Sequence, residues 1–467
     1  MMEKIPYKLA LVSDLHLSEG WDKNGFLQKK EDFFFDTSFK RFLAYLKEEA
    51  KKGDYHYRLL VNGDFVDFLQ FATPPDEEAV AGETITKRER TVGLGTGEAK
   101  TLWKIERLVE GHKVFFTAIA DFLANEHQLF ILPGNHDIEW VMPGVQESFK
   151  QRVSELVAAG GDLGDRITFL PWFYYDPLLS VFVEHGSQYD DINSFDYFLW
   201  PYRKDGTIDL PAGSFFVRYL FNRIEELYPF ADNMKPLTKF IGWALMRVQT
   251  YGGWPPQIVK FFEFFWNTLQ KARPTGKKRA KELQEKQTQE IQKLAQVSGM
   301  DEAKLGALKS HWVQSALHHH RWLGLLKSFY TNAKLDKWYY QERAREVQRV
   351  VGSRYVIFGH THEADLCTLS TSPDEMKKEY VNSGSWTKSF ASNYEEALLK
   401  EENEFVYVHI GYDEKKKGIK MDLLRWDDSL QQGERVKLFR SRKDQSKGGV
   451  HGKPQDGICS EGAGTPA

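Results

Sequence analysis

Short apolar runs recur along the chain, and each of them ends at a polar residue. Apolar runs of this length that are bounded by turn residues are typical of buried strands. The five predicted strands are residues 9–12, 58–62, 128–132, 179–183 and 355–358. Helical patterns separate several of them, at residues 36–51, 101–125 and 340–351. Strands that alternate with helices predict a layered α/β fold, with its functional groups in the loops at the strand ends.

Three further apolar segments follow the fifth strand without helices between them. They are residues 379–382, 405–410 and 419–426. We interpret these segments as strands of a second sheet. The predicted architecture is therefore a sandwich of two sheets that is flanked by helices.

A long stretch of different composition separates the fourth and fifth strands. Roughly one residue in four is aromatic between Tyr189 and Trp266, and residues 271–293 carry eight Lys or Arg against three Glu. We expect a mostly helical insert, or cap, at residues 191–344, between the two parts of a core formed by residues 1–190 and 345–440. Residues 441–467 are rich in Gly, Lys and Ser, and we expect a disordered tail there.

Composition narrows the class of protein. Of the 467 residues, 41% are hydrophobic and 28% are charged, and the formal net charge is -3. This is the balance of a globular protein, and it gives no electrostatic argument for a nucleic-acid partner. Only two cysteines occur, Cys367 and Cys459, so we expect no disulfide framework and a reducing compartment. The sequence shows neither a signal peptide nor a run of 18 apolar residues, so we expect a cytoplasmic protein.

Residues of the types that commonly bind metal ions (Asp, Asn and His) occur at all five predicted strand ends. Asp14 and His16 are two residues apart, so in extended backbone their side chains point to the same side. His360 and His362 repeat this spacing. The second, third and fourth strands are followed by Asp64, Asp67, Asn135, His136 and His185. A lone Asp-x-His pair is more often an ordinary loop, but five strand ends that all carry such residues are hard to explain by structural accident.

Taken together, these motifs resemble the ordered motif set of the calcineurin-like metallophosphoesterases. The motifs are Asp14-x-His16, Gly63–Asp64-x-x-Asp67, Gly134–Asn135–His136–Asp137, His185–Gly186 and Gly359–His360-x-His362. The resemblance covers about residues 1–190 and 345–430. It implies a four-layer αββα sandwich with a two-metal centre.

The resemblance also implies a role for each motif residue. One metal would be held by Asp14, His16, Asp64 and His362. The second metal would be held by Asp64, which bridges the two ions, and by Asn135, His185 and His360. His136 would not be a ligand but would face the leaving group, with Asp67 orienting its imidazole. Asn382 resembles part of a segment that lies near the site in several bacterial members.

The types of ligand predict the chemistry. Carboxylate, amide and imidazole ligands without a thiolate suit two divalent ions of Mn, Fe or Zn, and we favour Mn. Two such ions can share a water and lower its pKa, and the bridging hydroxide would attack phosphorus in a phosphoester or a pyrophosphate. His136 would then assist the departing oxygen.

The insert is the predicted source of substrate selectivity. Its pattern at residues 258–269 is apolar on most sides and includes the candidate substrate contacts Phe261, Phe265 and Trp266. Such a cap would select a phosphorylated small molecule or a lipid-linked substrate. The basic segment after it would make peripheral contact with a membrane if the insert docks there, although a solvated charged helix is the plainer interpretation.

Several alternatives stay open at this point. An aromatic cap is similar to that of the bacterial UDP-2,3-diacylglucosamine pyrophosphohydrolases, but those enzymes usually carry Arg at the position of His136. A nuclease would need a basic groove, and the only basic cluster lies in the insert. A non-catalytic scaffold would usually have lost a metal ligand or the catalytic His, and this chain has all of them.

Overall fold

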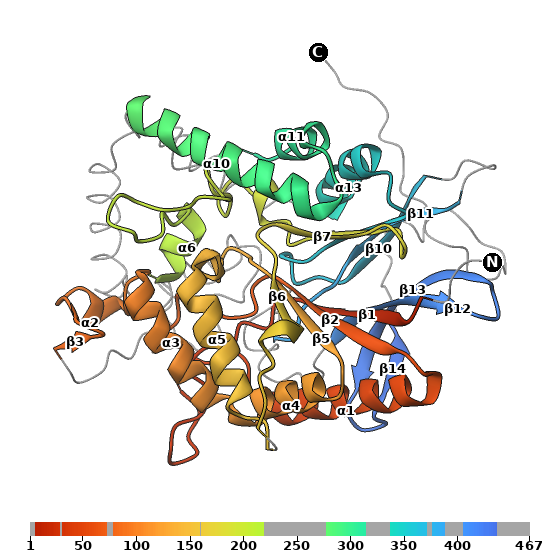
Figure 1. Cartoon of the computed structure of the whole chain (residues 1–467), viewed down its shortest axis with the longest axis horizontal. Coiled ribbons are helices and arrows are strands. Elements are labelled where there is room, and N and C mark those ends of the chain that lie inside the picture. The colour runs from red at the N-terminus through yellow and green to blue at the C-terminus, as the bar shows by residue number, and fades with distance from the viewer. Residues whose placement is uncertain are drawn as a thin grey trace, which may run out of the picture.

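The computed structural model describes residues 5–28, 30–71, 78–158, 160–218, 277–313, 337–370, 376–387 and 405–436. These residues form a mixed α/β fold with two principal sheets, and helices lie on the outer sides of the sheets (Figure 1). The α/β class that the alternating strands and helices predicted is therefore confirmed.

The first sheet has seven strands in the order β14-β13-β12-β1-β2-β5-β6. Its parallel part consists of β1 (Tyr7–Val12), β2 (His56–Asn62), β5 (Gln128–Leu132) and β6 (Ile167–Phe169). The antiparallel strands β12 (Val406–Asp413), β13 (Gly418–Asp427) and β14 (Gln432–Arg435) extend it beyond β1. Because Val12 pairs with Val61 and Asn62 with Leu132, the carboxyl ends of β1, β2 and β5 lie side by side.

The second sheet has five strands in the order β10-β11-β9-β8-β7. The strands are β7 (Phe173–Asp176), β8 (Val181–Glu184), β9 (Tyr355–Phe358), β10 (Asp365–Ser370) and β11 (Lys378–Asn382). The neighbours β8, β9 and β11 are parallel, whereas β7 and β10 run antiparallel at the two edges. Val183 pairs with Ile357, so the carboxyl ends of β8 and β9 adjoin although the whole insert separates them in sequence.

Alternate residues of β1 enter two different hydrophobic cores. Leu9 and Leu11 belong to a buried cluster that also contains Ile357 of the second sheet, so the two sheets pack on each other there. Ala10 and Val12 belong to a larger buried cluster that includes the helices. A strand that is buried on both faces has no polar alternation, which explains why β1 reads as a continuous apolar run.

Helices cover both sheets on their outer sides. On the side of the first sheet lie α1 (Asp36–Gly53), α3 (Glu98–Gly111), α4 (Lys113–Ala124) and α5 (Pro143–Ser154), which pack on one another. On the second sheet, α13 (Lys337–Val351) packs against β9, β10 and β11. Smaller elements precede α3: a hairpin of β3 (Ala79–Val80) and β4 (Glu83–Thr84), and the short helix α2 (Glu89–Val92).

Two predictions about these elements are wrong in detail. The later strands β12 and β13 were expected in a second sheet, but they join the first sheet because β12 pairs with β1, Leu9 opposite Ile410. The helix expected at residues 101–125 is two helices that meet at His112. Gly111 packs so tightly on the backbone of Glu19 that a Cβ at this glycine would lie 1.9 Å from the Glu19 carbonyl oxygen. This close contact fixes the break between α3 and α4.

Part of the predicted insert lies outside the described residues. Within residues 191–344 the structure describes α6 (Ala212–Phe216), α10 (Lys277–Ser298), α11 (Glu302–Ser310) and the start of α13. Residues 219–276 and 314–336 are not among the described ones, and these ranges contain Phe261, Phe265 and Trp266. The insert, its role as a cap and the tail at residues 441–467 therefore stay predictions.

Among the described residues, no helix is both long enough and apolar enough to cross a membrane. Cys459 lies outside the described residues, so the expectation of a chain without a disulfide framework stays a prediction.

Candidate metal centre

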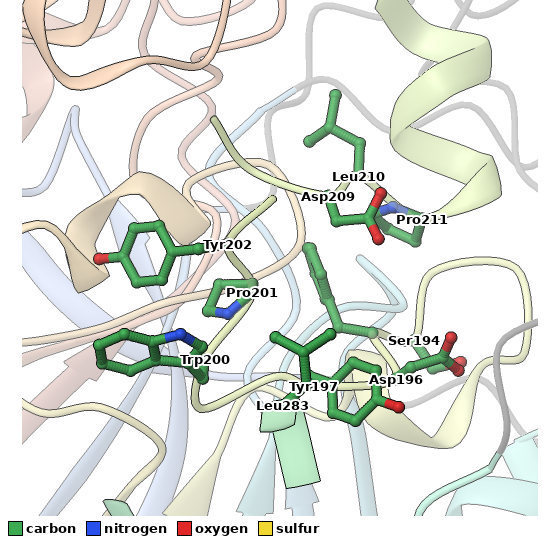
Figure 2. A pocket seen from close by; sticks show the side chains of 11 residues that line it. Ser194, Asp196, Tyr197, Trp200, Pro201, Tyr202, Asp209, Leu210, Pro211 and Leu283 are labelled. Carbon is green, nitrogen blue, oxygen red and sulfur yellow. The ribbon is translucent and has the colours of Figure 1, made fainter. Parts of the chain in front are cut away.

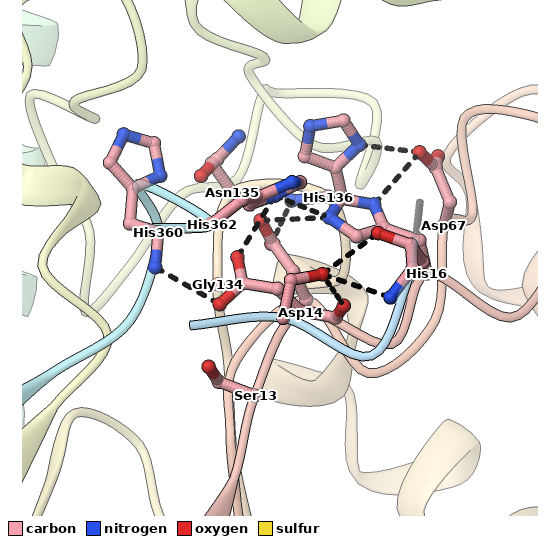
Figure 3. A network of polar contacts seen from close by, with 12 residues as sticks. Ser13, Asp14, His16, Asp67, Gly134, Asn135, His136, His360 and His362 are labelled. Atoms are coloured by element: carbon pink, nitrogen blue, oxygen red, sulfur yellow. Dashed lines mark hydrogen bonds and ion pairs between the residues drawn. The ribbon is translucent and has the colours of Figure 1, made fainter. Parts of the chain in front are cut away.

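The carboxyl ends of five strands converge on one buried cluster of Asp, Asn and His side chains (Figure 3). Asp14 and His16 follow β1, Asp64 follows β2, Asn135 follows β5, and His185, His360 and His362 follow β8 and β9. Each of these seven side chains is buried. The register of the two sheets therefore brings together residues that are more than 300 positions apart in the sequence, such as His16 and His362, whose Nε2 atoms are 3.1 Å apart.

Three groups within the cluster have the composition of metal sites. One is His16, Asp67 and His136, and the other two share a carboxylate. Of these two, the first is Asp14, His16, Asp64 and His362, and the second is Asp64, His185 and His360. In each group the candidate ligand atoms lie within 4.8 Å of one another. Asp64 belongs to both groups, which is the position of a bridging ligand.

One oxygen of Asp64 faces both groups. Its Oδ2 lies 3.8 Å from His16 Nε2 and 3.2 Å from His185 Nε2. Its Oδ1 accepts a hydrogen bond of 2.9 Å from the backbone N–H of His136. The hydrogen bond to Oδ1 therefore fixes the orientation of the carboxylate, and Oδ2 is shared between the two ligand groups.

Hydrogen bonds to the other ring nitrogen orient the imidazole rings of His185 and His360. His185 Nδ1 lies 2.8 Å from the backbone carbonyl of Asn62, so this nitrogen donates and Nε2 turns toward Asp64. His360 Nε2 lies 3.1 Å from Asp190 Oδ2, which turns Nδ1 to the opposite side of that ring. A carboxylate or carbonyl behind a ligand imidazole selects its tautomer, and this pattern is common around protein-bound metals.

Three buried polar atoms support the fit of the residues to metal ions. Asp14 Oδ1, Asn135 Oδ1 and His185 Nε2 are shielded from solvent and make no hydrogen bond of good geometry in the described structure. Two of them face a charged neighbour instead: Asp14 Oδ1 lies 3.2 Å from His362 Nε2, and His185 Nε2 lies 3.2 Å from Asp64 Oδ2. Unpaired buried polar atoms cost free energy, and a group of them that converges on one point suits a cation. Asn135 presents this oxygen because its Nδ2 lies 3.5 Å from Asn193 Oδ1.

Glycines make the close approach of the motif loops feasible. A Cβ at Gly134 would lie 2.1 Å from Asp64 Oδ1, and a Cβ at Gly63 would lie 2.4 Å from His185 Nδ1. Gly63 also has a φ of 77°, which side chains other than glycine rarely adopt. The motif glycines therefore leave room for the neighbouring ligand itself.

Several candidate ligands have a left-handed backbone. The φ angles are 52° at Asp14, 50° at His16, 47° at Asp64, 67° at His360 and 59° at His362. Positive φ is uncommon for residues with a side chain and is concentrated at functional sites, where the surrounding fold imposes it. The spacing of the Asp14–His16 and His360–His362 pairs predicted an extended backbone, and this prediction is wrong, because all four residues have a positive φ. The side chains of both residues in each pair still point into the site, because both residues have the same left-handed backbone conformation.

His136 forms a separate pair with Asp67. Its Nδ1 lies 2.5 Å from Asp67 Oδ2, and Asp67 is fully buried. Burial alone would raise the pKa of Asp67, but the neighbouring His136 and His16 outweigh it and hold that pKa below its ordinary value. An ionised Asp67 favours a proton on the imidazole of His136, which suits a general acid.

The charges of the cluster are strongly coupled. Burial would raise the pKa of Asp64, but His185 and His136 hold it well below its ordinary value. Burial would lower the pKa of His185, but Asp64 and Asp14 outweigh it and raise that pKa to about 9. A cation at the site would therefore compete with protons for these ligands, since a metal binds the neutral imidazole.

The sequence motif of calcineurin-like phosphoesterases matches residues 7–246, just over half of the chain. The chain belongs to the calcineurin-like phosphoesterase family. It is therefore a metal-binding hydrolase of phosphoesters, and the buried ligand groups agree with a site for two metals. No curated protein matches the chain. The family match ends before His360 and His362, which the structure nevertheless places in the phosphoesterase site.

Sequence reasoning assigned no role to some residues that support this phosphoesterase site. Asp137 accepts hydrogen bonds from the backbone N–H groups of Gly134 (2.6 Å) and Phe65 (2.8 Å), so it ties two motif loops together. Asp190 supports His360, as described above. Asp137 lies inside a recognised motif, which was a usable signal, whereas no pattern singled out Asp190.

Asn382 has a structural contact at the same site. Its Nδ2 donates to the carbonyl of Gly359 at 2.8 Å, and its Oδ1 accepts from the N–H of Gly384. It therefore holds the loop that carries His360 and His362.

A hollow that is partly open to solvent is lined by residues 194–197, 200–202 and 209–211 and by Leu283 of α10 (Figure 2). Its walls are mostly aromatic or apolar and include Tyr197, Trp200, Tyr202 and Leu283. One wall continues from Asn193, which contacts Asn135. Pro211, another lining residue, lies three positions before Ser214, whose Oγ donates to the Asn135 carbonyl at 2.9 Å. The hollow is thus linked to the metal centre through short chain segments.

Proposed function

We propose that this phosphoesterase hydrolyses a phosphoester or pyrophosphate at a two-metal centre formed by Asp14, His16, Asp64, Asn135, His185, His360 and His362. The observation that carries the proposal is the position of Asp64 Oδ2, which faces His16 in one ligand group and His185 in the other. Two divalent metal ions bound there would supply Lewis-acid chemistry that activates water and neutralises charge on the phosphoryl group. Mn, Fe and Zn all suit these ligands, and we favour Mn.

The protein's own residues would orient the reaction. His136 is the more accessible member of its pair: 9% of its surface is accessible to solvent, whereas Asp67 has no accessible surface. The proton on Nδ1 is held by Asp67 at 2.5 Å, so the Nε2 edge is the one that can meet a substrate. We assign His136 to the departing oxygen, to which it gives a proton, and Asp67 to the orientation of His136.

The experiment separates ligand from acid. Asp64→Asn should lose both bound metal and hydrolysis of an aryl phosphate, because Asp64 contributes to both ligand groups. His136→Ala should keep two metal ions per chain and lose turnover by about 10²–10⁴-fold, the usual contribution of a general acid. Elemental analysis after Mn loading gives the metal content. Loss of metal in His136→Ala to the same extent as in Asp64→Asn would refute the role of His136.

We further propose that the hollow takes the non-phosphate part of the substrate, which would be a phosphorylated small molecule or a lipid-linked one. Two observations support this proposal: the aromatic walls of the hollow offer apolar contact area, and the chain neighbour of its lining residue Ser194, Asn193, contacts Asn135. Trp200→Ala should raise KM for esters with a bulky apolar group while KM for a small aryl phosphate stays nearly constant. Trp338→Ala, which changes a tryptophan that is 50% exposed on α13, is the matched control.

A UDP-diacylglucosamine-type pyrophosphohydrolase is one specific form of this proposal, and it would require the insert to bind acyl chains at a membrane surface. Hydrolysis of a lipid-linked pyrophosphate in preference to monoesters would favour it. A nuclease would instead show salt-sensitive binding of DNA. A scaffold would hydrolyse no ester, including a generic aryl phosphate.

A further inference from the structure

A buried cation lies behind the pair of Asp67 and His136. It is Lys104 on α3, whose side chain has no surface exposure. Its Nζ donates a hydrogen bond of 2.8 Å to the backbone carbonyl of Phe68, the residue that follows Asp67. A fully buried lysine is rare, because removing an ammonium from water is costly unless nearby groups compensate.

The peptide segment that Lys104 contacts is fixed to His136 from its other side. The N–H of Phe68 donates to the carbonyl of His136 at 3.3 Å. Asp67 Oδ1 accepts hydrogen bonds from the N–H groups of Leu69 (2.9 Å) and Gln70 (3.1 Å). Its Oδ2 faces His136 at 2.5 Å and, at the longer distance of 3.5 Å, His16 Nδ1. The position of the Asp67 carboxylate therefore depends on the course of the backbone at residues 67–70.

The charge of Lys104 is balanced by acidic groups. Glu139 is fully buried, and neither of its carboxylate oxygens has a hydrogen-bond partner in the described structure. Burial lowers the pKa of Lys104 to about 8, and Glu139 and Asp67 oppose this by favouring its charged form. Lys104 is the largest charge that stabilises ionised Glu139, ahead of Arg218. Removing the ammonium would therefore leave Glu139 with much of its charge uncompensated, and breaking a buried ionic group in this way is costly.

We propose that Lys104 is a positioning residue of the hydrolytic site: by fixing the Phe68 carbonyl it keeps Asp67 against His136, and so it maintains the acid that serves the departing oxygen. This inference rests on the proposed function, because it assigns Lys104 to the leaving-group half of that reaction. The hydrogen bond that Lys104 makes among the described residues goes to the Phe68 carbonyl and not to a candidate metal ligand.

The test uses the leaving group as the readout. Lys104→Met is compared with the parent on a series of aryl phosphates whose phenols range from strongly to weakly acidic. Esters of weakly acidic phenols need protonation of the departing oxygen, so their kcat should fall by about tenfold to a hundredfold, the range for loss of one hydrogen bond from a charged donor. Esters of the most acidic phenol should change by less than about threefold. Lys104→Arg, which keeps the charge, should restore most of the loss.

Lys100→Met is the matched control. Lys100 lies one turn earlier on the same helix, is nearly buried, and pairs with Glu89 at 2.7 Å instead of with the Asp67 segment. Its variant should show no dependence on the leaving group. An equal loss for all esters in Lys104→Met, or a loss of the same pattern in Lys100→Met, would overturn the proposal. If Lys104→Met does not fold, Lys104→Gln takes its place, and the same trend is expected.

Two further measurements separate this proposal from the proposed function. In a His136→Ala background the change of Lys104 should have almost no additional effect, and additive losses would overturn the inference. The Nδ1 proton of His136 can also be followed by NMR without any substrate. Its signal should be present in the parent and Lys104→Arg and lost in Lys104→Met. An unchanged signal overturns the role of Lys104, whereas absent hydrolysis with the expected NMR result overturns only the proposed reaction.

Discussion

His112 at the break between α3 and α4 makes the stability of the protein depend on pH in a defined direction. The ring is fully buried, with Nδ1 3.0 Å from Asp36 Oδ1 and Nε2 3.1 Å from Glu31 Oε2. Carboxylates only accept hydrogen bonds, so both ring nitrogens must donate, and the ring must therefore be an imidazolium. Burial opposes this charge, but Glu31 and Asp36 outweigh it and raise the pKa of His112 from 6.5 to about 9.

The magnitude follows from the difference between the folded and unfolded pKa of His112. Because the folded pKa is raised, the contribution is complete below pH 6.5 and is lost as the pH rises through about 9. At about 1.4 kcal/mol for each tenfold change in proton affinity, the full contribution is about 3 kcal/mol, most of it still present at pH 7 and almost none at pH 10. We therefore expect the protein to become easier to unfold across this range.

The assay is urea unfolding of the parent and of His112→Gln at about pH 7 and pH 10, with a chelator present so that metal binding does not contribute. At each pH, the measured quantity is the unfolding free energy of the parent minus that of His112→Gln. This difference should be about 2–3 kcal/mol larger at pH 7 than at pH 10. His409→Gln is the control, since burial lowers the pKa of His409 to about 4 and its ring stays neutral in this range. An equal loss at both pH values in His112→Gln would refute the imidazolium and the reasoning built on it.

Two further predictions concern the metal centre. Gly134→Ala would place a Cβ 2.1 Å from Asp64 Oδ1, so we expect it to displace the shared carboxylate and to lower metal content after dialysis against a chelator; unchanged retention would contradict this use of the glycine. Asp190→Ala should lower metal affinity by about 10–100-fold, because it removes the carboxylate that orients His360, while circular dichroism shows an intact fold; titration with Mn measures the affinity.

The positions of the candidate ligands were accessible to sequence reasoning because each lies directly after a strand. A strand buried on both faces gives a clear apolar run, and the loop at its end is short, so Asp14 lies two residues after β1 and His185 one residue after β8. These positions depend on local order along the chain. The pairing of His136 with Asp67 joins two separate motifs, and only the family resemblance implied it.

Features that depend on contacts between distant segments were not accessible in this way. The pattern at residues 405–410 predicts a strand but carries no information about which sheet it joins, and β12 joins β1 through a pairing about 400 residues away. The break at His112 arises from the contact of Gly111 with Glu19, which helix periodicity cannot show. Lys104 and Glu139 read as ordinary charged residues of a helix and a turn, although both are fully buried.

The site also explains why a long stretch of chain between β8 and β9 is compatible with the chemistry. Neither ligand group is complete without the loop that follows β9, because the first contains His362 and the second contains His360. That loop is placed by the pairing of Val183 with Ile357, and the positions of the two strand ends do not depend on the length of chain that connects them. Since the entropic cost of a longer loop grows only slowly with its length, the connection can lengthen while the register keeps His360 and His362 opposite His185 and Asp14. The core therefore fixes the metal ligands, and the intervening residues are free to differ in what they contribute to the substrate side.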